Sequence, residues 1–144
     1  MDNKKLMEDL LTVLPYWHYK IDKTIKQTLK SEMSLETYYC LQTLRREGPM
    51  TMTELAGRLK ITKQQATKLA GKLYEHQFLE RIPDKNDRRC IRVQISEAAR
   101  NYMAQERAQN DIYIGRLEEQ LKPEDIEKFE SALEILLEVL PKLE

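Results

Sequence analysis

The sequence predicts a mainly α-helical fold with one small β-hairpin, an α+β class. Three observations lead to this prediction. Apolar residues recur at helical spacing along most of the chain, and Ser or Thr stands where several helices would begin. Between residues 78 and 95 the pattern changes to two short apolar–polar runs around a charged loop, which is typical of antiparallel strands. With 144 residues, 41% of them hydrophobic, the chain has the size and composition of one domain.

Composition excludes several classes of protein. Charges of both signs precede any apolar run in residues 1–9, so we expect no signal peptide, and no apolar run is long enough to span a bilayer. Two cysteines, Cys40 and Cys90, form neither a disulfide framework nor a metal-binding pattern. His18 and His76 lie far apart in the sequence, without clustered ligands. We expect a cytoplasmic protein without metal or cofactor.

The first two helices are predicted from apolar spacing. Apolar residues follow helical spacing from residue 3 to about 31, and Pro15 predicts a kink or a break within this segment. Ser34 can cap a second helix, which Gly48 and Pro49 would end.

Two capped helices and a hairpin follow. Thr51 to Glu54 and Thr62 to Gln65 have the spacing of capping boxes, which fixes where two helices begin. The second of these helices runs to about His76, and its buried stripe consists of Ala66, Leu69, Ala70 and Leu73. Strands are expected at 78–82 and 90–95, with Ile91, Val93 and Ile95 facing inward. Helix, turn, helix and hairpin are the order of a winged helix-turn-helix.

Ser96 can cap a long helix over roughly 97–120, and Pro123 can begin the last one. The first and last helices each carry an apolar stripe that needs a partner, so we expect them to pack together between two chains. Residues 1–144 then form a single domain, in which 34–100 are a winged helix-turn-helix DNA-binding lobe and 1–33 and 101–144 are dimerisation helices.

The formal net charge is zero, but the charged residues are unevenly distributed along the chain. Residues 57–100 carry a net charge of +6, residues 101–144 carry −6, and residues 1–56 are balanced. A positive middle third indicates binding to a polyanion. The alternative is a soluble protein with a large dipole.

The second helix of the pair is the candidate reader of DNA. Residues at its N-terminal end lie nearest the base edges when such a helix enters the major groove. Gln can pair with adenine, and Lys with guanine or a phosphate. The candidate residues on the face opposite the buried stripe are Lys63, Gln64, Gln65, Thr67, Lys68 and Lys72. The alternative is an ordinary solvated helix face.

The loop of the hairpin is a candidate second DNA contact. Lys85, Arg88 and Arg89 would form the tip of a wing, and arginine in a wing commonly enters a minor groove. An acidic residue among these cations, Asp87, is explained if its carboxylate holds an arginine in one conformation. The alternative is a hairpin with weak surface ion pairs.

These residues resemble the MarR family of bacterial transcription regulators. The run from Leu79 to Arg89, continuing through Val93-Gln94-Ile95-Ser96, is similar to the family's wing signature, with Asp87 and Arg89 in its Asp-x-Arg positions. Ser96 and Ala99 replace the family's usual Thr and Gly. The resemblance implies a homodimer that binds a pseudo-palindromic operator and usually represses, with release on binding of a small, often phenolic, ligand or on cysteine oxidation. It also implies that Arg89 enters the minor groove and that Asp87 supports it.

The sequence is less specific about which signal, a ligand or an oxidant, the protein would sense. An aromatic set near the expected junction of the dimerisation and DNA-binding parts could line a ligand crevice or form core and interface packing: Tyr16, Trp17, His18, Tyr19, Tyr38 and Tyr39. Cys90 follows two arginines, which could lower its pKa and make it redox-active, whereas Cys40 is expected to be buried and inert.

Two other functions compete with a DNA-binding regulator. A winged helix could instead bind an acidic protein partner through the same basic face. An enzyme is the weakest alternative, because the sequence has no nucleophile beside a base, no glycine-rich phosphate loop and no metal cluster.

Overall fold

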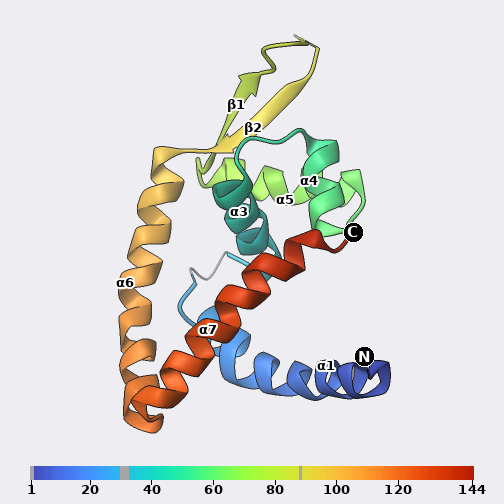
Figure 1. Ribbon diagram of the computed structural model, residues 1–144. Coiled ribbons are helices and arrows are strands. Elements are labelled where there is room, and N and C mark those ends of the chain that lie inside the picture. Colours follow the sequence, from blue (N-terminus) through green and yellow to red (C-terminus); the bar gives the residue numbers. More distant parts are fainter. Residues whose placement is uncertain (1, 30–32, 88) are drawn as a thin grey trace.

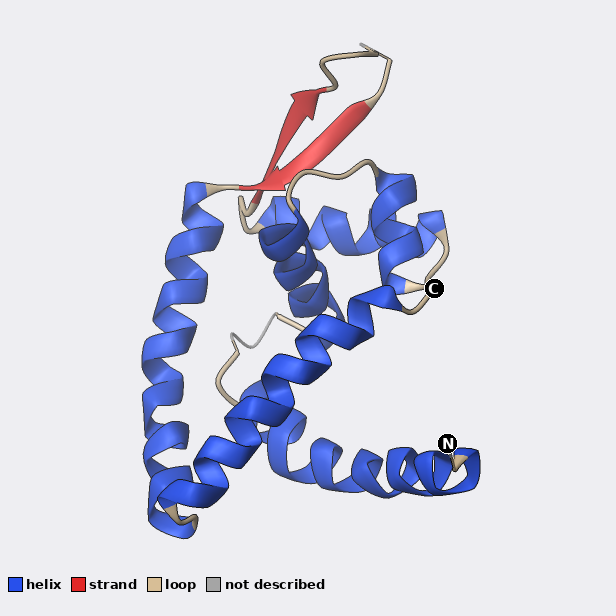
Figure 2. Cartoon of the chain, in the orientation of Figure 1, coloured by secondary structure: helices blue, strands red, loops and turns tan. Residues whose placement is uncertain are grey.

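Three helices, α3 (Leu35–Glu47), α4 (Met52–Leu59) and α5 (Lys63–Glu75), pack together at the base of a two-stranded hairpin, and the other helices extend from this lobe (Figure 1). The computed structural model describes residues 2–29, 33–87 and 89–144. The mainly helical α+β fold with a winged-helix core is confirmed, as Figure 2 shows. In chain order the elements are α1 (Asn3–Trp17), the π-helix η1 (His18–Asp22), α2 (Lys23–Lys26), α3 (Leu35–Glu47), α4 (Met52–Leu59), α5 (Lys63–Glu75), β1 (Leu79–Pro83), β2 (Ile91–Ile95), α6 (Glu97–Gln120), α7 (Pro123–Val139) and the 3₁₀ turn η2 (Leu140–Lys142).

One hydrophobic core holds the lobe together. Leu41 and Leu44 of α3, Leu55 of α4 and Leu73 of α5 are each at most 2% exposed. Burying a leucine side chain stabilises a fold by about 1.5–3 kcal/mol. The same core takes in residues from β2 and from the first turns of α6: Val93, Ile95, Ala99, Tyr102 and Met103. The core therefore fixes α5 relative to the hairpin and to α6.

The predicted Ser and Thr caps are confirmed. The hydroxyl oxygens of Ser34, Thr51, Thr62 and Ser96 each accept a hydrogen bond from the backbone N–H three residues further on. Helix α3 ends at Gly48, whose φ of 88° favours glycine. The caps determine where α4 and α5 begin, and therefore which residues of α5 point away from the core.

Thr51 and Glu54 form only half of the predicted capping box. The Glu54 N–H donates to Thr51 Oγ1 at 3.2 Å, but the Glu54 carboxylate accepts hydrogen bonds from Arg92 of β2 rather than from the Thr51 N–H. A guanidinium is a charge-assisted donor and forms a stronger hydrogen bond than a neutral amide. The prediction of a reciprocal box at α4 is therefore wrong.

Strands β1 and β2 pair antiparallel, with Pro83 opposite Ile91. The hairpin is joined to the lobe by one backbone bridge, in which Met50 N–H donates to Val93 O at 3.0 Å and Val93 N–H donates to Met50 O at 2.8 Å. Val93 and Ile95 are buried as predicted, but Ile91 is 52% exposed. Ile91 lies closer to the tip of the hairpin, where the strand has passed the edge of the core.

Helix α1 does not break at Pro15. It continues to Trp17, and α-helical geometry is interrupted only at the π-helix His18–Asp22. Pro15 has no backbone N–H to donate, but hydrogen bonds further along the helix remain, including the one from the His18 N–H to Leu14 O. The Tyr113 hydroxyl of α6 donates to Lys20 O in the π-helix at 2.8 Å.

Helices α1 and α7 contain no buried residue in the single chain. The large apolar residues exposed on these helices and on η2 include Leu6, Met7, Leu10, Leu11, Leu14, Ile135, Leu136, Leu137, Val139 and Leu140. Contiguous exposed apolar surface of this kind commonly marks an interface. None of the helices in the described ranges has the length and apolar content needed to cross a membrane.

Candidate nucleic-acid interface

The exposed face of α5 is polar and positively charged. Ala66, Ala70 and Leu73 face the core and are buried, so the opposite side of the helix is open to solvent. The candidate residues Lys63, Gln64, Gln65, Thr67, Lys68 and Lys72 are all exposed. The structure therefore brings the predicted recognition residues together on the solvent side of one helix.

Two of these side chains already form hydrogen bonds within α5. Gln65 Oε1 accepts a hydrogen bond from the Thr62 N–H at 3.0 Å, and Gln65 N–H donates to Thr62 Oγ1 at 3.1 Å, which completes the second predicted capping box. Thr67 Oγ1 donates to Lys63 O at 2.9 Å. A glutamine reads adenine through both its oxygen and its NH₂ group. Gln65 has its oxygen engaged, so Gln64 is the better placed of the two for such a contact.

At the tip of the hairpin, Asp87 accepts hydrogen bonds from the backbone of the loop. Its Oδ1 accepts a hydrogen bond from the Arg89 N–H at 2.9 Å, and Cys90 N–H donates to Asp87 O at 3.0 Å. The carboxylate therefore fixes the main chain at Arg89. Lys85 and Arg89 are exposed. The candidate Arg88 lies outside the described residues.

The two cysteines differ in environment, and neither carries an activated thiol. The charge of Asp87 is the main cause that raises the pKa of Cys90, and Cys90 Sγ lies 3.6 Å from Asp87 Oδ2. The expectation that neighbouring arginines lower this pKa is wrong, because the nearer group is the carboxylate. Cys40 is fully buried, and burial raises its pKa to about 12. Both thiols are thereby kept protonated near neutral pH.

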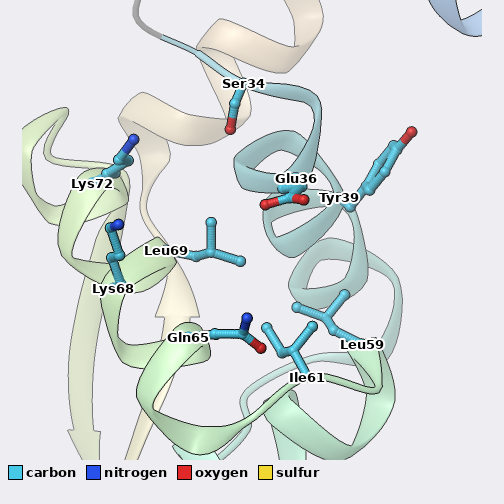
Figure 3. A pocket seen from close by; sticks show the side chains of 9 residues that line it. All are labelled: Ser34, Glu36, Tyr39, Leu59, Ile61, Gln65, Lys68, Leu69 and Lys72. Atoms are coloured by element: carbon cyan, nitrogen blue, oxygen red, sulfur yellow. The ribbon is translucent and has the colours of Figure 1, made fainter.

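A cavity of about 510 Å³ lies between α3 and α5, and Figure 3 shows the side chain of Leu69 pointing into it. Its lining combines apolar, amide, carboxylate and ammonium groups: Ser34, Glu36, Tyr39, Leu59, Ile61, Gln65, Lys68, Leu69 and Lys72. Partial burial, followed by the negative charges of Asp22 and Glu36, raises the pKa of Tyr39. Three of the lining residues (Gln65, Lys68 and Lys72) also belong to the exposed face of α5.

The structure distributes the candidate aromatic set over several places. Tyr39 lines the cavity beside α5, whereas Tyr16 and Tyr19 line a separate groove of about 380 Å³ on α1 and η1. Tyr38 packs against the core, and its hydroxyl accepts a hydrogen bond from Gln42 Nε2 at 2.9 Å. His18 makes an edge contact with Tyr19, and Trp17 is 38% exposed. The cavity residues that sequence reasoning missed come from the N-terminal end of α3 (Ser34 and Glu36), from α4 and α5, and from the turn between those two helices.

One cluster at the base of the hairpin was not predicted. Arg92 Nη1 donates to both oxygens of Glu54, at 3.2 and 3.0 Å, and Arg92 Nε lies 3.7 Å from Asp84 Oδ1. The Glu54 carboxylate raises the pKa of Arg92. Periodicity could place Arg92 on the polar face of its strand, but it could not show that α4 lies opposite. Within the described residues, no three His, Cys, Asp or Glu side chains are grouped as a metal site.

Known proteins share both sequence and fold with the chain. The MarR family profile matches residues 33–91. YpoP, an uncharacterized HTH-type transcriptional regulator of Bacillus subtilis, is 33% identical over 94 residues, which span 65% of this chain and 67% of YpoP. A MarR family protein from Bacillus stearothermophilus superimposes with a TM-score of 0.76 at 19% identity, covering 99% of this chain and 100% of that one.

A MepR mutant from S. aureus bound to an oligodeoxyribonucleotide has a TM-score of 0.65 at 18% identity, covering 91% of this chain and 97% of that one. Structures at such low identity establish the fold alone. The sequence match to YpoP and the profile match, together with the winged-helix lobe described above, establish the family. The chain belongs to the MarR family of transcriptional regulators.

Proposed function

We propose that this protein is a homodimeric, sequence-specific DNA-binding regulator of transcription, acting as a repressor. The observation that supports this most strongly is α5, a capped helix in a winged-helix lobe that exposes lysine and glutamine opposite its buried stripe. Such a helix lies in the major groove, with its N-terminal residues at the base edges. Gln64 contacts a base, and Lys63, Lys68 and Lys72 contact bases or phosphates.

The wing supplies the second contact. Arg89 enters the minor groove beside the recognition helix, and Lys85 and Arg88 add positive charge there. The hydrogen bond from the Arg89 N–H to Asp87 supports this role, because it fixes the backbone from which the arginine side chain projects.

Two chains form the functional unit. Residues 1–33 and 101–144 are the dimerisation segments, and 34–100 form the DNA-binding lobe. The exposed apolar residues of α1 and α7 support this arrangement, since a second copy would remove them from water. A two-fold dimer presents two copies of α5, which suits a pseudo-palindromic operator.

Ligand binding in the cavity between α3 and α5 releases the DNA. Lys68 and Lys72 suit an anionic group, and Leu59, Ile61 and Leu69 suit an apolar body. A small aromatic carboxylate has both features. Because Gln65, Lys68 and Lys72 serve the cavity and the DNA-facing surface, occupation of one site weakens the other.

The proposal includes a cytoplasmic location and no enzymatic activity. Its test is fluorescence anisotropy with the purified protein, DNA from upstream of its own gene and a scrambled duplex of equal length. We expect tighter binding to the upstream DNA, resistance to excess random duplex, and weakening as salt rises. Equal binding to both duplexes, displaced by an acidic protein, would instead favour a protein-interaction module.

A further inference from the structure

Arg92 connects three segments that are far apart in the sequence. From β2, its guanidinium reaches Glu54 in the first turn of α4 through two hydrogen bonds of 3.2 and 3.0 Å. It also lies 3.7 Å from Asp84, which follows β1 on the other arm of the hairpin. Both arms of the wing are thus linked to the helix that precedes the recognition helix.

The location of this cluster matters because the other contacts of the hairpin with the lobe lie closer to its base. Leu79, Val93 and Ile95 belong to the core, and Arg81, opposite Val93, donates from Nε to the hydroxyl of Tyr74 in α5 at 3.4 Å. The Met50–Val93 backbone bridge holds the hairpin at its base. Arg92 is the next residue toward the tip, and the hydrogen bonds of Asp87 at the tip stay within the loop. A two-stranded hairpin alone is only marginally stable and twists easily. The contact with Glu54 is therefore placed to set the tilt of the wing.

The exposure of the cluster argues against a mainly stabilising role. The side chains of Arg92 and Glu54 are 30% and 48% exposed, and ion pairs this open to water contribute little to stability. The guanidinium is nevertheless held from two sides, because Nη1 donates to both oxygens of Glu54 and Nε lies 3.7 Å from Asp84 Oδ1. Such a pair orients two elements more than it stabilises them.

We propose that Arg92 is a positioning residue for DNA binding: held by Glu54 and Asp84, it fixes the wing relative to α4 and α5. The wing tip and the recognition helix then meet the same duplex together. The Arg92 guanidinium is engaged by carboxylates and does not contact a phosphate. This inference rests on the proposed DNA-binding function, but it assigns a role to residues outside the recognition helix and wing tip.

Variants that neutralise one charge at a time distinguish a role in positioning the wing from a direct electrostatic effect on DNA. Arg92→Gln removes a positive charge and Glu54→Gln removes a negative charge. If the charges act on DNA directly, the first variant weakens binding and the second strengthens it. If the pair positions the wing, both weaken binding by about tenfold, and the double variant is no weaker than either single one.

The probe is a duplex that the wild-type protein selects from a randomised library, with affinity measured by anisotropy over a range of salt. We expect the salt slope of Arg92→Gln to equal that of the wild type, since no phosphate contact is lost. Glu80→Gln is the matched control, because Glu80 bonds Gln94 within the hairpin and does not reach α4.

A salt slope reduced by about one in Arg92→Gln, or tighter binding by Glu54→Gln, overturns the inference. Hydrogen exchange without DNA gives a second readout: faster exchange at residues 84–92 is expected in both single variants but not in Glu80→Gln, and unchanged exchange contradicts the inference. If Arg92→Gln does not fold, Arg92→Lys takes its place. Failure of the wild type to select any sequence rejects the proposed function, while the exchange experiment still tests the positioning role.

Discussion

Gln65 Oε1 accepts a hydrogen bond from the Thr62 N–H at 3.0 Å, so a side chain on the exposed face of α5 is occupied in capping its own helix. Gln64, one residue earlier, is exposed on the same turn. The two neighbours therefore provide a matched pair of substitutions.

Gln64→Ala should impair DNA discrimination, whereas Gln65→Ala should impair stability. Loss of a bidentate base contact costs about 1–3 kcal/mol of discrimination, so Gln64→Ala should bind selected and random duplexes with more similar affinities at unchanged stability. Gln65→Ala should lower the free energy of unfolding by about 1 kcal/mol and largely keep sequence preference. Anisotropy and chemical denaturation measure the two effects. Equal loss of discrimination in both variants would contradict the assignment.

Much of the fold was predictable because its signals are local. A capping hydroxyl and the amide that it accepts from are three residues apart, so Ser34, Thr62 and Ser96 could be assigned from the sequence. Helical periodicity likewise predicted three buried residues of α5, Ala66, Ala70 and Leu73, but it was wrong for Leu69, which is only partly buried and lines the cavity. Since the cap and the buried stripe determine which side of α5 faces the core, the exposed candidate residues on that helix could be predicted as well.

Features that depend on distant residues could not be predicted. The Glu54 carboxylate has two potential partners, and only the folded chain brings Arg92 within reach. The charge balance at Cys90 likewise depends on how the loop folds Asp87 back toward the sulfur. The cavity needs α3 beside α5, so the sequence indicated Tyr39 as a possible ligand contact but did not indicate Lys68 and Lys72 in that role.

Asp87→Asn should make Cys90 more reactive. The carboxylate raises the pKa of this thiol, so removing its charge lowers the pKa and increases the thiolate fraction at pH 8. We expect alkylation by iodoacetamide to be several-fold faster, as measured by mass spectrometry, with asparagine still able to accept from the Arg89 N–H. Cys40 serves as the internal control and should stay unmodified in the folded protein. A rate at Cys90 that falls or does not change would contradict the electrostatic assignment.

Leu10→Glu should weaken the dimer. Leu10 is 56% exposed in the single chain, and a charged group buried at a dimer interface without a partner is strongly unfavourable. Sedimentation should show dissociation at a higher protein concentration than in the wild type. The charge-matched control is Asn86→Glu in the wing loop, which should remain dimeric. A Leu10→Glu protein that dimerises as tightly as the control would show that α1 lies outside the interface.

Leu69→Phe should make DNA binding insensitive to a cavity ligand. The Leu69 side chain points into the cavity, and a larger ring there occupies space that a ligand needs. With benzoate as the probe, the wild-type protein should lose DNA affinity as benzoate rises, whereas the variant should not. Isothermal titration of benzoate without DNA reports binding directly. Benzoate that weakens DNA binding equally in both proteins would place its action outside this cavity.

The most direct test of the central claim is selection of DNA from a randomised duplex library by the purified protein, followed by sequencing. A dimer that presents two copies of α5 should retain a two-fold symmetric consensus, with half-sites separated by about one helical turn, 10–10.5 base pairs. Substitution of Gln64 should alter equivalent positions in both half-sites. Retained DNA without any consensus, or a consensus that does not change with Gln64, would contradict sequence-specific binding through α5.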